Sequence, residues 1–297
     1  MEENSKLDNV NNFDKLWNYN KPDETEKKFR EILSEVKDSG NRSAYLQLQT
    51  QIARTLGLQM KFDEAHKLLD EVESELSKDE ITTARVRYLL ERGRAFNSSK
   101  QKEKAKEFFL KAFELGLKSG EENYTVDAAH MMAIVESGDE SLKWNGKAIQ
   151  QAEKSSDQNA RKWLGSLYNN TGWTYFEMKD YEKALELFIK CREWHLESKN
   201  INGIFYSKWN VAKVLRMLGK IDEAMEIQNL LREEMETGKA EMDGYVYEEL
   251  GECSLINGKD NEAKDYFGKA YDLLSKDIWM VEDEKERLQR IKELGGK

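Results

Sequence analysis

Proline is nearly absent from this sequence, since Pro22 is the only one among 297 residues. A domain of this length built from strands and tight turns would carry several times more proline, because proline is common in turns and excluded from helix interiors. The shortage favours helices joined by short Gly, Asn and Asp connections. We therefore expect an all-α chain.

Long apolar runs and cysteines are also scarce. No stretch of eighteen apolar residues occurs, and the first thirteen residues lack the basic start and the apolar segment of a signal peptide. The two cysteines, Cys191 and Cys253, are too few for a disulfide framework, and neither belongs to a C-x-x-C pair. We expect a cytoplasmic protein with no membrane segment, whose cysteines are small core residues.

Positive charge is in deficit, because 57 Asp and Glu residues outnumber 47 Lys and Arg and leave a net charge of −10. The average field of such a surface repels phosphate backbones and anionic lipid headgroups. Nucleic acid and membranes are therefore poor candidates for the partner of this protein.

The chain contains a repeat of about forty residues. Its clearest copy spans residues 168–194, and segments beginning at Lys61, Lys102, Lys220 and Lys259 match the second half of that copy. A compact core rarely extends over a chain of this length, whereas a repeat array can. One small or short side chain stands early in the second helix of each copy, at spacings of 40, 40, 39, 40 and 39: Ala65, Ala105, Asn145, Ala184, Ala224 and Ala263.

Apolar residues follow each of these positions at helical spacing. In most copies a large side chain comes four residues later and another apolar residue three after that, which is one face of a helix. Forty residues before Ala65, Thr25 is followed by Phe29 and Ile32, so a further N-terminal helix pair is expected. A second row of small residues lies twelve positions before the first and allows the two helices of a pair to approach closely: Ala53, Gly93, Ala133, Gly172, Ala212 and Gly251.

Glycines and a terminal apolar pattern mark the ends of the elements. Gly219 and Gly258 occupy equivalent places between two helices, where a left-handed residue ends the first one. Residues 278–297 predict one more amphipathic helix, which covers the last repeat as a capping helix does, through Ile278, Val281, Leu288, Ile291 and Leu294.

This pattern of small and large residues resembles the tetratricopeptide repeat. The best copy holds Tyr168, Gly172, Tyr175, Ala184 and Phe188 in the register of that family, and the resemblance covers roughly residues 6–277. It implies a right-handed α-solenoid of stacked antiparallel helix pairs with a C-terminal capping helix. It implies little about function, because the shared residues are packing residues.

The resemblance sets the expected organisation. We expect a flexible N-terminus at 1–11, about seven helix pairs over 12–277, of which the last six (43–277) are clearest, and the capping helix at 278–297. The copy at 121–157 is degenerate, because Glu136 stands where an aromatic residue is expected. The family unit is about 34 residues with a frequent terminal proline. The longer period here, without that proline, is similar to kinesin light chains and Rap-type bacterial regulators. HEAT and armadillo repeats share the period but lack the small and large signature.

The resemblance also implies a binding groove. In this family the first helix of each pair lines a concave surface, and its non-packing positions contact ligands. Asn170 and Asn210 share one such position in adjacent copies, where asparagines of the family hold the backbone of an extended peptide. The candidate peptide-binding residues are Asn169, Asn170, Trp173, Tyr206, Trp209, Asn210, Lys213, Arg216, Arg54, Arg87 and Arg94.

Each of these features has a second interpretation. Asparagine is also an ordinary residue of a helix surface, and Trp173 and Trp209 either anchor a ligand or pack between repeats. The five cations predict an acidic or carboxylate-bearing peptide, and the acidic last copy of the repeat would attract the basic end of that peptide. A chain with 35% charged residues also places such charges on a solvated face by chance.

Residue patterns for catalysis are missing. His66, His130 and His195 fall on separate helices, and the sequence has no phosphate-binding glycine loop, no G-x-S-x-G and no H-E-x-x-H. We expect no enzymatic activity, catalytic residue, cofactor or metal. The leading hypothesis is an interaction scaffold that binds a peptide segment of a partner protein in the groove. The alternative is a peptide-responsive regulator of the Rap type, and binding of single-stranded RNA ranks third.

Overall fold

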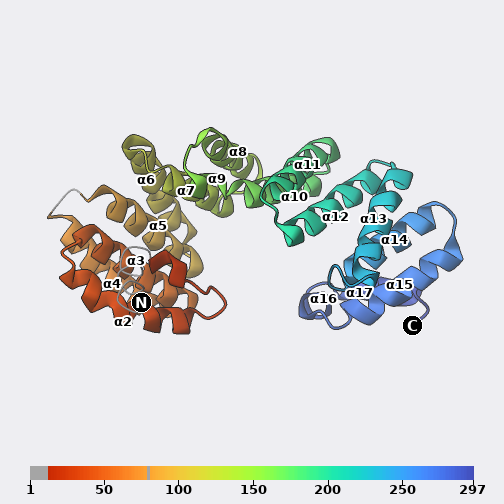
Figure 1. Ribbon diagram of the computed structural model, residues 1–297, viewed down its shortest axis with the longest axis horizontal. Helices are drawn as coiled ribbons and strands as arrows, with labels where there is room; N and C mark the ends of the chain where they lie inside the picture. The colour runs from red at the N-terminus through yellow and green to blue at the C-terminus, as the bar shows by residue number, and fades with distance from the viewer. Residues whose placement is uncertain (1–12, 79–80) are drawn as a thin grey trace. The chain divides into compact units, whose positions relative to one another are not determined.

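The structure is a computed structural model that describes residues 13–78 and 81–297, and the regular elements of these ranges are all helical (Figure 1). The chain forms two compact units, Met1–Trp163 and Leu164–Lys297, called unit 1 and unit 2 below. No helix in the described ranges is both long enough and apolar enough to cross a bilayer. The segment predicted as a flexible N-terminus, 1–11, lies outside the described residues.

Unit 1 is a stack of helix pairs that begins with a short 3₁₀-helix. Sequential helices pack against each other, and α3 also packs against α5. The elements of unit 1 are η1 Phe13–Leu16, α2 Pro22–Asp38, α3 Arg42–Leu58, α4 Phe62–Leu76, α5 Thr82–Ser98, α6 Lys102–Ser119, α7 Glu122–Val135, α8 Gly138–Lys154 and α9 Gln158–Arg161.

Unit 2 repeats the arrangement with three helix pairs and two terminal helices. Within it α10 packs on α11, α12 on α13 and α14 on α15, and α17 covers α15. These helices are α10 Leu164–Glu177, α11 Tyr181–Glu197, α12 Ile201–Met217, α13 Ile221–Glu236, α14 Gly244–Ile256, α15 Asp260–Leu274, α16 Ile278–Glu282 and α17 Lys285–Leu294. The predicted all-α array of antiparallel helix pairs is confirmed within each unit.

The two rows of small residues meet bulky partners across each helix pair. Gly93, Gly172 and Gly251 each lie against the ring of a phenylalanine in the following helix, so that an added Cβ would stand 2.5, 2.7 and 3.0 Å from Phe109, Phe188 and Phe267 respectively. These three phenylalanines are fully buried. Where the first helix instead carries alanine, as at Ala53, the partner position holds a smaller side chain, Leu69. A larger side chain on one helix therefore faces a smaller residue on the other, so that the combined volume of the two side chains fits between the helices.

Left-handed residues end the first helix in several pairs. Gly219 and Gly258 have φ angles of 76° and 71°, as the sequence predicts. Met60, Lys100 and Lys179 adopt the same conformation at equivalent places, with φ of 62°, 64° and 64°. This conformation costs a non-glycine residue about 1–2 kcal/mol. The packing of the two helices therefore imposes the turn even where the local sequence disfavours it.

Within the described residues, the first helix pair of unit 1 is incomplete. Helix α2 starts at Pro22, which lacks the backbone N–H that would have no partner in the first turn, and it buries Thr25 and Phe29. The described residues before α2 contain η1 in place of a full first helix. Its Phe13 is buried edge-on against Phe29, with ring centroids 6.3 Å apart.

The degenerate copy is shortened in the structure. Helix α7 ends at Val135, and Glu136 caps it in an extended conformation. The Glu136 carboxylate lies 3.0 Å from the Lys106 ammonium group of α6. The residue that replaces the expected aromatic therefore ends the helix and forms a surface ion pair in place of a packing contact.

The C-terminal cap differs from the single helix expected over residues 278–297. The chain forms two short helices, α16 and α17, separated at Asp283 and Glu284. Ile291 is buried as predicted, but Ile278 and Val281 are exposed and Met280 is the buried residue of α16. The break gives two separate helices, of which α16 buries Met280 and α17 buries Ile291.

Gln228 of α13 gives a first prediction. It occupies the position of Phe188 and Phe267 in the neighbouring pairs, is fully buried, and has no described hydrogen-bond partner for its amide oxygen or nitrogen. We expect Gln228→Leu to raise the free energy of unfolding by about 1–3 kcal/mol, because it removes the desolvation cost of unpaired polar atoms. Urea denaturation measures this change. The exposed Gln150→Leu is the control and should leave the midpoint unchanged, and a lower midpoint for Gln228→Leu would contradict the prediction.

Candidate functional site

The first helices of the pairs are called inner helices and the second ones outer helices below, and the inner helices of unit 2, α10, α12 and α14, carry a row of aromatic rings. Trp173 of α10, Trp209 of α12 and Tyr245 of α14 follow one another, with ring centroids 6.1 Å apart at both steps. Phe176 extends the row, 5.1 Å from Trp173. Because Phe176 lies near the end of α10 and Tyr245 near the start of α14, the row runs obliquely across the three helices.

A cavity of about 610 Å³ opens along this row, within the size range of ligand pockets. Six of its twelve lining residues are aromatic, and two of these, Tyr206 and Trp279, are 58% and 47% exposed. A ligand could therefore contact them without displacing other side chains. The cavity, called the aromatic groove below, is lined by Asn169, Trp173, Phe176, Glu177, Tyr206, Trp209, Asn210, Lys213, Asp243, Tyr245, Trp279 and Arg287.

A chain of amides lies beside the rings. The Asn210 Nδ2 donates to Asn169 Oδ1 at 2.8 Å, and the Asn169 Nδ2 donates to Asn170 Oδ1 at 3.2 Å. Asn210 is buried, whereas Asn170 is exposed. The two asparagines predicted to act as an equivalent pair are thus linked through Asn169, and the exposed end of the chain is Asn170.

Two predicted cations of unit 2 bind a buried carboxylate. Glu249 of α14 is 1% exposed and accepts from Lys213 Nζ at 2.6 Å and from Arg216 Nε at 2.7 Å. Burial alone would raise the pKa of Glu249, but Lys213 and Arg216 hold this pKa below its ordinary value. The two cations therefore connect α12 to α14, and their charge is largely neutralised before any ligand arrives.

The same pattern joins α17 to α14. Arg287 donates to both oxygens of Glu248, at 2.7 and 2.6 Å, and its guanidinium group lies 5.4 Å from the centre of the Tyr245 ring. Lys213 lies similarly over Trp209, at 5.0 Å. Each cation thus contacts one ring of the aromatic row while a buried carboxylate compensates its charge.

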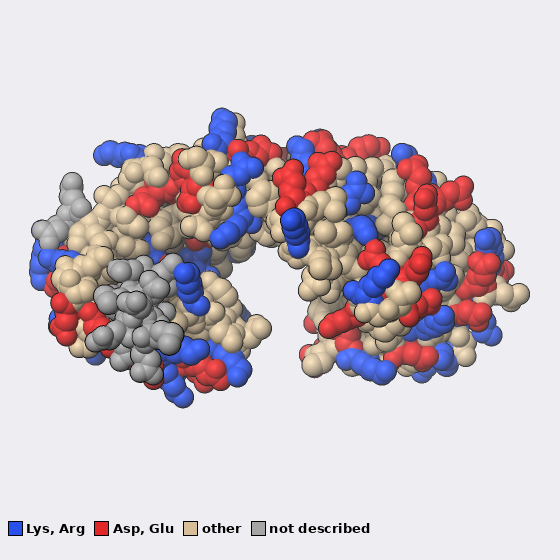
Figure 2. Space-filling model, in the orientation of Figure 1, with Lys and Arg blue, Asp and Glu red and all other residues tan. Residues whose placement is uncertain are grey.

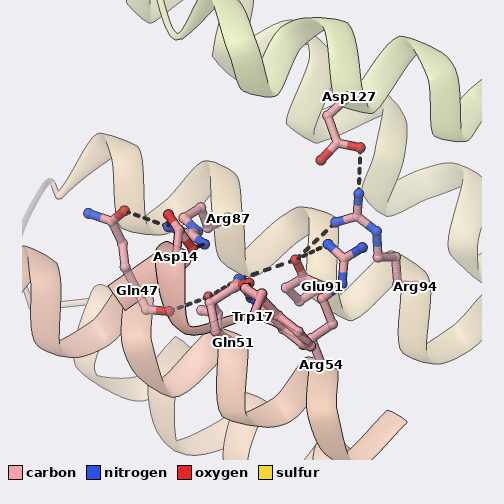
Figure 3. Close-up of polar contacts among 10 residues, drawn as sticks. Asp14, Trp17, Gln47, Gln51, Arg54, Arg87, Glu91, Arg94 and Asp127 are labelled. Atoms are coloured by element: carbon pink, nitrogen blue, oxygen red, sulfur yellow. Dashed lines mark hydrogen bonds and ion pairs between the residues drawn. The ribbon is translucent and has the colours of Figure 1, made fainter. Parts of the chain in front are cut away.

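The inner face of unit 1 is closed by a comparable network (Figure 3). Glu91 of α5 accepts from Arg54 at 3.3 Å and from Arg94 at 2.9 Å, and Arg94 also binds Asp127 of α7. Gln51 donates to the same Glu91 oxygen. The predicted cations Arg54 and Arg94 therefore bridge neighbouring inner helices.

The third predicted cation of unit 1 holds the N-terminal segment. Arg87 donates to both carboxylate oxygens of Asp14, at 2.9 and 2.6 Å (Figure 3). Trp17 donates from its indole nitrogen to Gln51 at 3.1 Å, and Arg54 lies over the Trp17 ring. Asp14 and Trp17 therefore contact Arg87 and Arg54, two side chains of α5 and α3 that the sequence predicts to contact a ligand.

The predicted site residues thus fall into three groups. Six of them line the aromatic groove together: Asn169, Trp173, Tyr206, Trp209, Asn210 and Lys213. Asn170 adjoins that groove through its hydrogen bond to Asn169, and Arg216 lies on Glu249. Arg54, Arg87 and Arg94 belong to unit 1 and bind its own carboxylates.

Sequence reasoning missed Asp243, Trp279 and Arg287 as groove residues. None of them stands at a repeated position of an inner helix: Asp243 precedes α14, and the other two belong to the terminal helices. Their placement depends on how the chain turns back after α15. No spacing in the sequence marks them.

Charges of both signs are interspersed on the visible face of the molecule (Figure 2). The described residues include no group of three or more His, Cys, Asp or Glu side chains suited to hold a metal ion. Cys191 and Cys253 are buried, as predicted, and burial raises the pKa of the first to about 11 and of the second to about 12. Neither thiol is a nucleophilic thiolate at neutral pH.

Two segments match the family model for the tetratricopeptide repeat, residues 86–115 and 165–194. They coincide with the pairs α5–α6 and α10–α11. The chain contains tetratricopeptide repeats. Comparison with curated proteins finds no match.

Solved structures share the fold at low sequence identity. The chain is similar to a signal transduction ATPase with a tetratricopeptide repeat sensor from Pyrococcus horikoshii, with 14% identity and a TM-score of 0.72 over 91% of this chain. It spans 41% of the length of that protein. The apo form of RapI is 16% identical with a TM-score of 0.71, over 97% of this chain and 83% of RapI.

A tetratricopeptide repeat-containing protein from Cytophaga hutchinsonii is 15% identical with a TM-score of 0.58, over 94% of this chain and 97% of the other. At these identities the similarity concerns the fold alone. The residues of the aromatic groove must carry any functional argument.

Proposed function

We propose that this protein is a non-enzymatic interaction module that binds a peptide segment of a partner protein in the aromatic groove. The observation that carries the proposal is the oblique row of Trp173, Trp209 and Tyr245, bordered by the exposed rings of Tyr206 and Trp279. Large exposed aromatic surfaces mark interaction sites, and rigid aromatic anchors supply much of the energy of peptide interfaces.

The amide chain beside the rings suits a peptide backbone. A bound peptide must find partners for its N–H and C=O groups, and an amide side chain offers both a donor and an acceptor. Asn170 is exposed at the edge of the groove, and Asn169 connects it to Asn210. Backbone contacts from amides together with side-chain contacts from rings support a peptide better than a small apolar molecule.

The repeat fold fits this role, since one of the similar structures is described as containing a tetratricopeptide repeat sensor. Rings, amides and neutralised ion pairs make up most of the described lining of the groove, which suits binding. A peptide-responsive regulator would use the same groove, so the binding test below applies to that alternative as well.

The test uses random twelve-residue peptides displayed on phage and selected on the wild-type protein. Synthetic versions of the selected peptides are then titrated by fluorescence anisotropy. We expect Trp209→Ala to weaken binding by about 30-fold, because truncation of a central aromatic anchor costs about 2 kcal/mol. Tyr206→Ala, at a 58% exposed side chain, should weaken binding with little effect on folding.

The control is Leu196→Ala, at an exposed position of the outer helix α11. It should leave the affinity unchanged. Peptides that bind the wild type and both groove variants equally well would show that the aromatic groove is not their site, and the proposal would then fail.

A further inference from the structure

The charge left available in the aromatic groove is negative. Lys213 and Arg287 are its only cations among the described lining residues, and the buried carboxylates of Glu249 and Glu248 compensate them at 2.6 Å. The two lining carboxylates, Glu177 and Asp243, form no ion pair with a described lysine or arginine. A ligand therefore meets two uncompensated negative groups among six rings.

These carboxylates stand at the two ends of the aromatic row. Glu177 ends α10 beside Phe176 and is exposed. Asp243 immediately precedes α14, and the backbone N–H of Tyr245 donates to its Oδ1 at 2.8 Å. The row of rings thus connects one acidic end to the other.

The surroundings of Asp243 strengthen its attraction for a cation. This side chain is partly buried, and burial together with the nearby carboxylates of Asp277 and Glu248 raises its pKa above the ordinary value. Of these neighbours, Glu248 is bound by Arg287. Among the described residues, Asp277 accepts from two neutral donors, the Tyr245 hydroxyl and the Trp279 backbone N–H, and pairs with no lysine or arginine. A ligand cation here would relieve repulsion between carboxylates in a partly desolvated place.

We infer that the groove selects a basic peptide, in which lysine or arginine side chains flank an apolar or aromatic residue. The flanking cations pair with Asp243 and Glu177, and the central side chain lies against Trp173 and Trp209. The exposed rings of Tyr206 and Trp279 add cation–π attraction, for which tryptophan is the strongest partner. This inference rests on the proposed function and names its ligand class.

Two lysines of an adjoining cavity limit where the peptide can run. Lys239 and Lys276 line a second cavity of about 670 Å³, which shares Tyr206, Asp243 and Tyr245 with the aromatic groove. Neither lysine is paired with a described carboxylate. They disfavour a basic residue beyond Asp243, so the cations of the ligand belong within the length of the aromatic row.

This ligand class differs from the acidic or carboxylate-bearing peptide that the five cations of the sequence predict. The sequence shows the cations of the inner helices but not their pairing. Once Lys213 and Arg216 are bound to Glu249, they no longer set the sign of the field that a ligand experiences.

The phage selection described above tests the inference through the composition of the selected peptides. We expect peptides that need Trp209 for binding to be enriched in Lys and Arg. Their affinity should fall about tenfold with Asp243→Asn, as for a partly buried charge pair, and should weaken with added salt. Asparagine is as good a helix N-cap as aspartate, so Asp243→Asn keeps the Tyr245 hydrogen bond and the fold. An unchanged melting temperature verifies this.

Asp222→Asn, an exposed aspartate in the first turn of the outer helix α13, is the matched control and should leave the affinity unchanged. Trp209-dependent peptides that are acidic or uncharged, or that bind Asp243→Asn as tightly as the wild type, would overturn this inference and leave the proposed function intact. Recovery of no Trp209-dependent peptide would overturn both.

Discussion

Replacing Glu249 with glutamine is expected to lower the free energy of unfolding of unit 2 by about 3–5 kcal/mol, because it removes one partner of a buried charge network. Lys213 and Arg216 would remain, each 15% exposed, with no carboxylate between them. Urea denaturation followed by circular dichroism measures the change. Glu223→Gln removes the exposed partner of Lys220 and is the control, for which a change of at most about 0.5 kcal/mol is expected.

The contribution of Glu249 to the free energy of unfolding should depend on pH in a defined direction. The pKa of Glu249 is lowered in the folded protein relative to its ordinary value of 4.5. A carboxylate with a lowered folded pKa contributes stability above the unfolded pKa and loses this contribution as the pH falls through the folded value. The stability gap between wild type and Glu249→Gln should therefore be constant near pH 7 and narrow below about pH 4.5. A gap of the same size at pH 7 and pH 3 would contradict this account.

Gly172→Ala is expected to destabilise unit 2 by about 3 kcal/mol, at the upper end of the usual cost of overpacking. The new Cβ would lie 2.7 Å from the ring of Phe188, which is fully buried. Gly57→Ala is the matched control, because an added Cβ there meets no atom within 4 Å. That change should stabilise helix α3 by about 0.5–1 kcal/mol.

A second substitution should rescue the first. Phe188→Leu alone leaves a cavity, but combined with Gly172→Ala it reproduces the Ala53 and Leu69 pair of the first clear repeat. The double variant should therefore be more stable than the sum of the single changes predicts, with a coupling of at least 1 kcal/mol. Simple additivity in thermal or urea unfolding would show that the two positions do not share their packing volume.

Much of the fold follows from local pattern. Small and large residues at constant spacing predict the helix pairs. Gly172 and Phe188 show the reason, because the Phe188 ring lies so close to the first helix that position 172 has no space for a side chain. The start of α2 at Pro22 and the left-handed residues Gly219 and Gly258 follow from backbone preference. Local pattern does not predict the course of the terminal helices α16 and α17, because this course depends on which surface of α15 is left free for them to pack on.

The sequence by itself therefore determined the helical repeat, the rows of packing residues and the inner-helix positions that carry Trp173, Trp209 and the asparagines. Only the tertiary structure decided which inner side chains remain for a ligand. Lys213 and Glu249 lie 36 positions apart on different helices, so their 2.6 Å contact depends on the distance and rotation between α12 and α14. Periodicity within one helix shows on which face of that helix a side chain lies, but not which residue of the neighbouring helix it contacts.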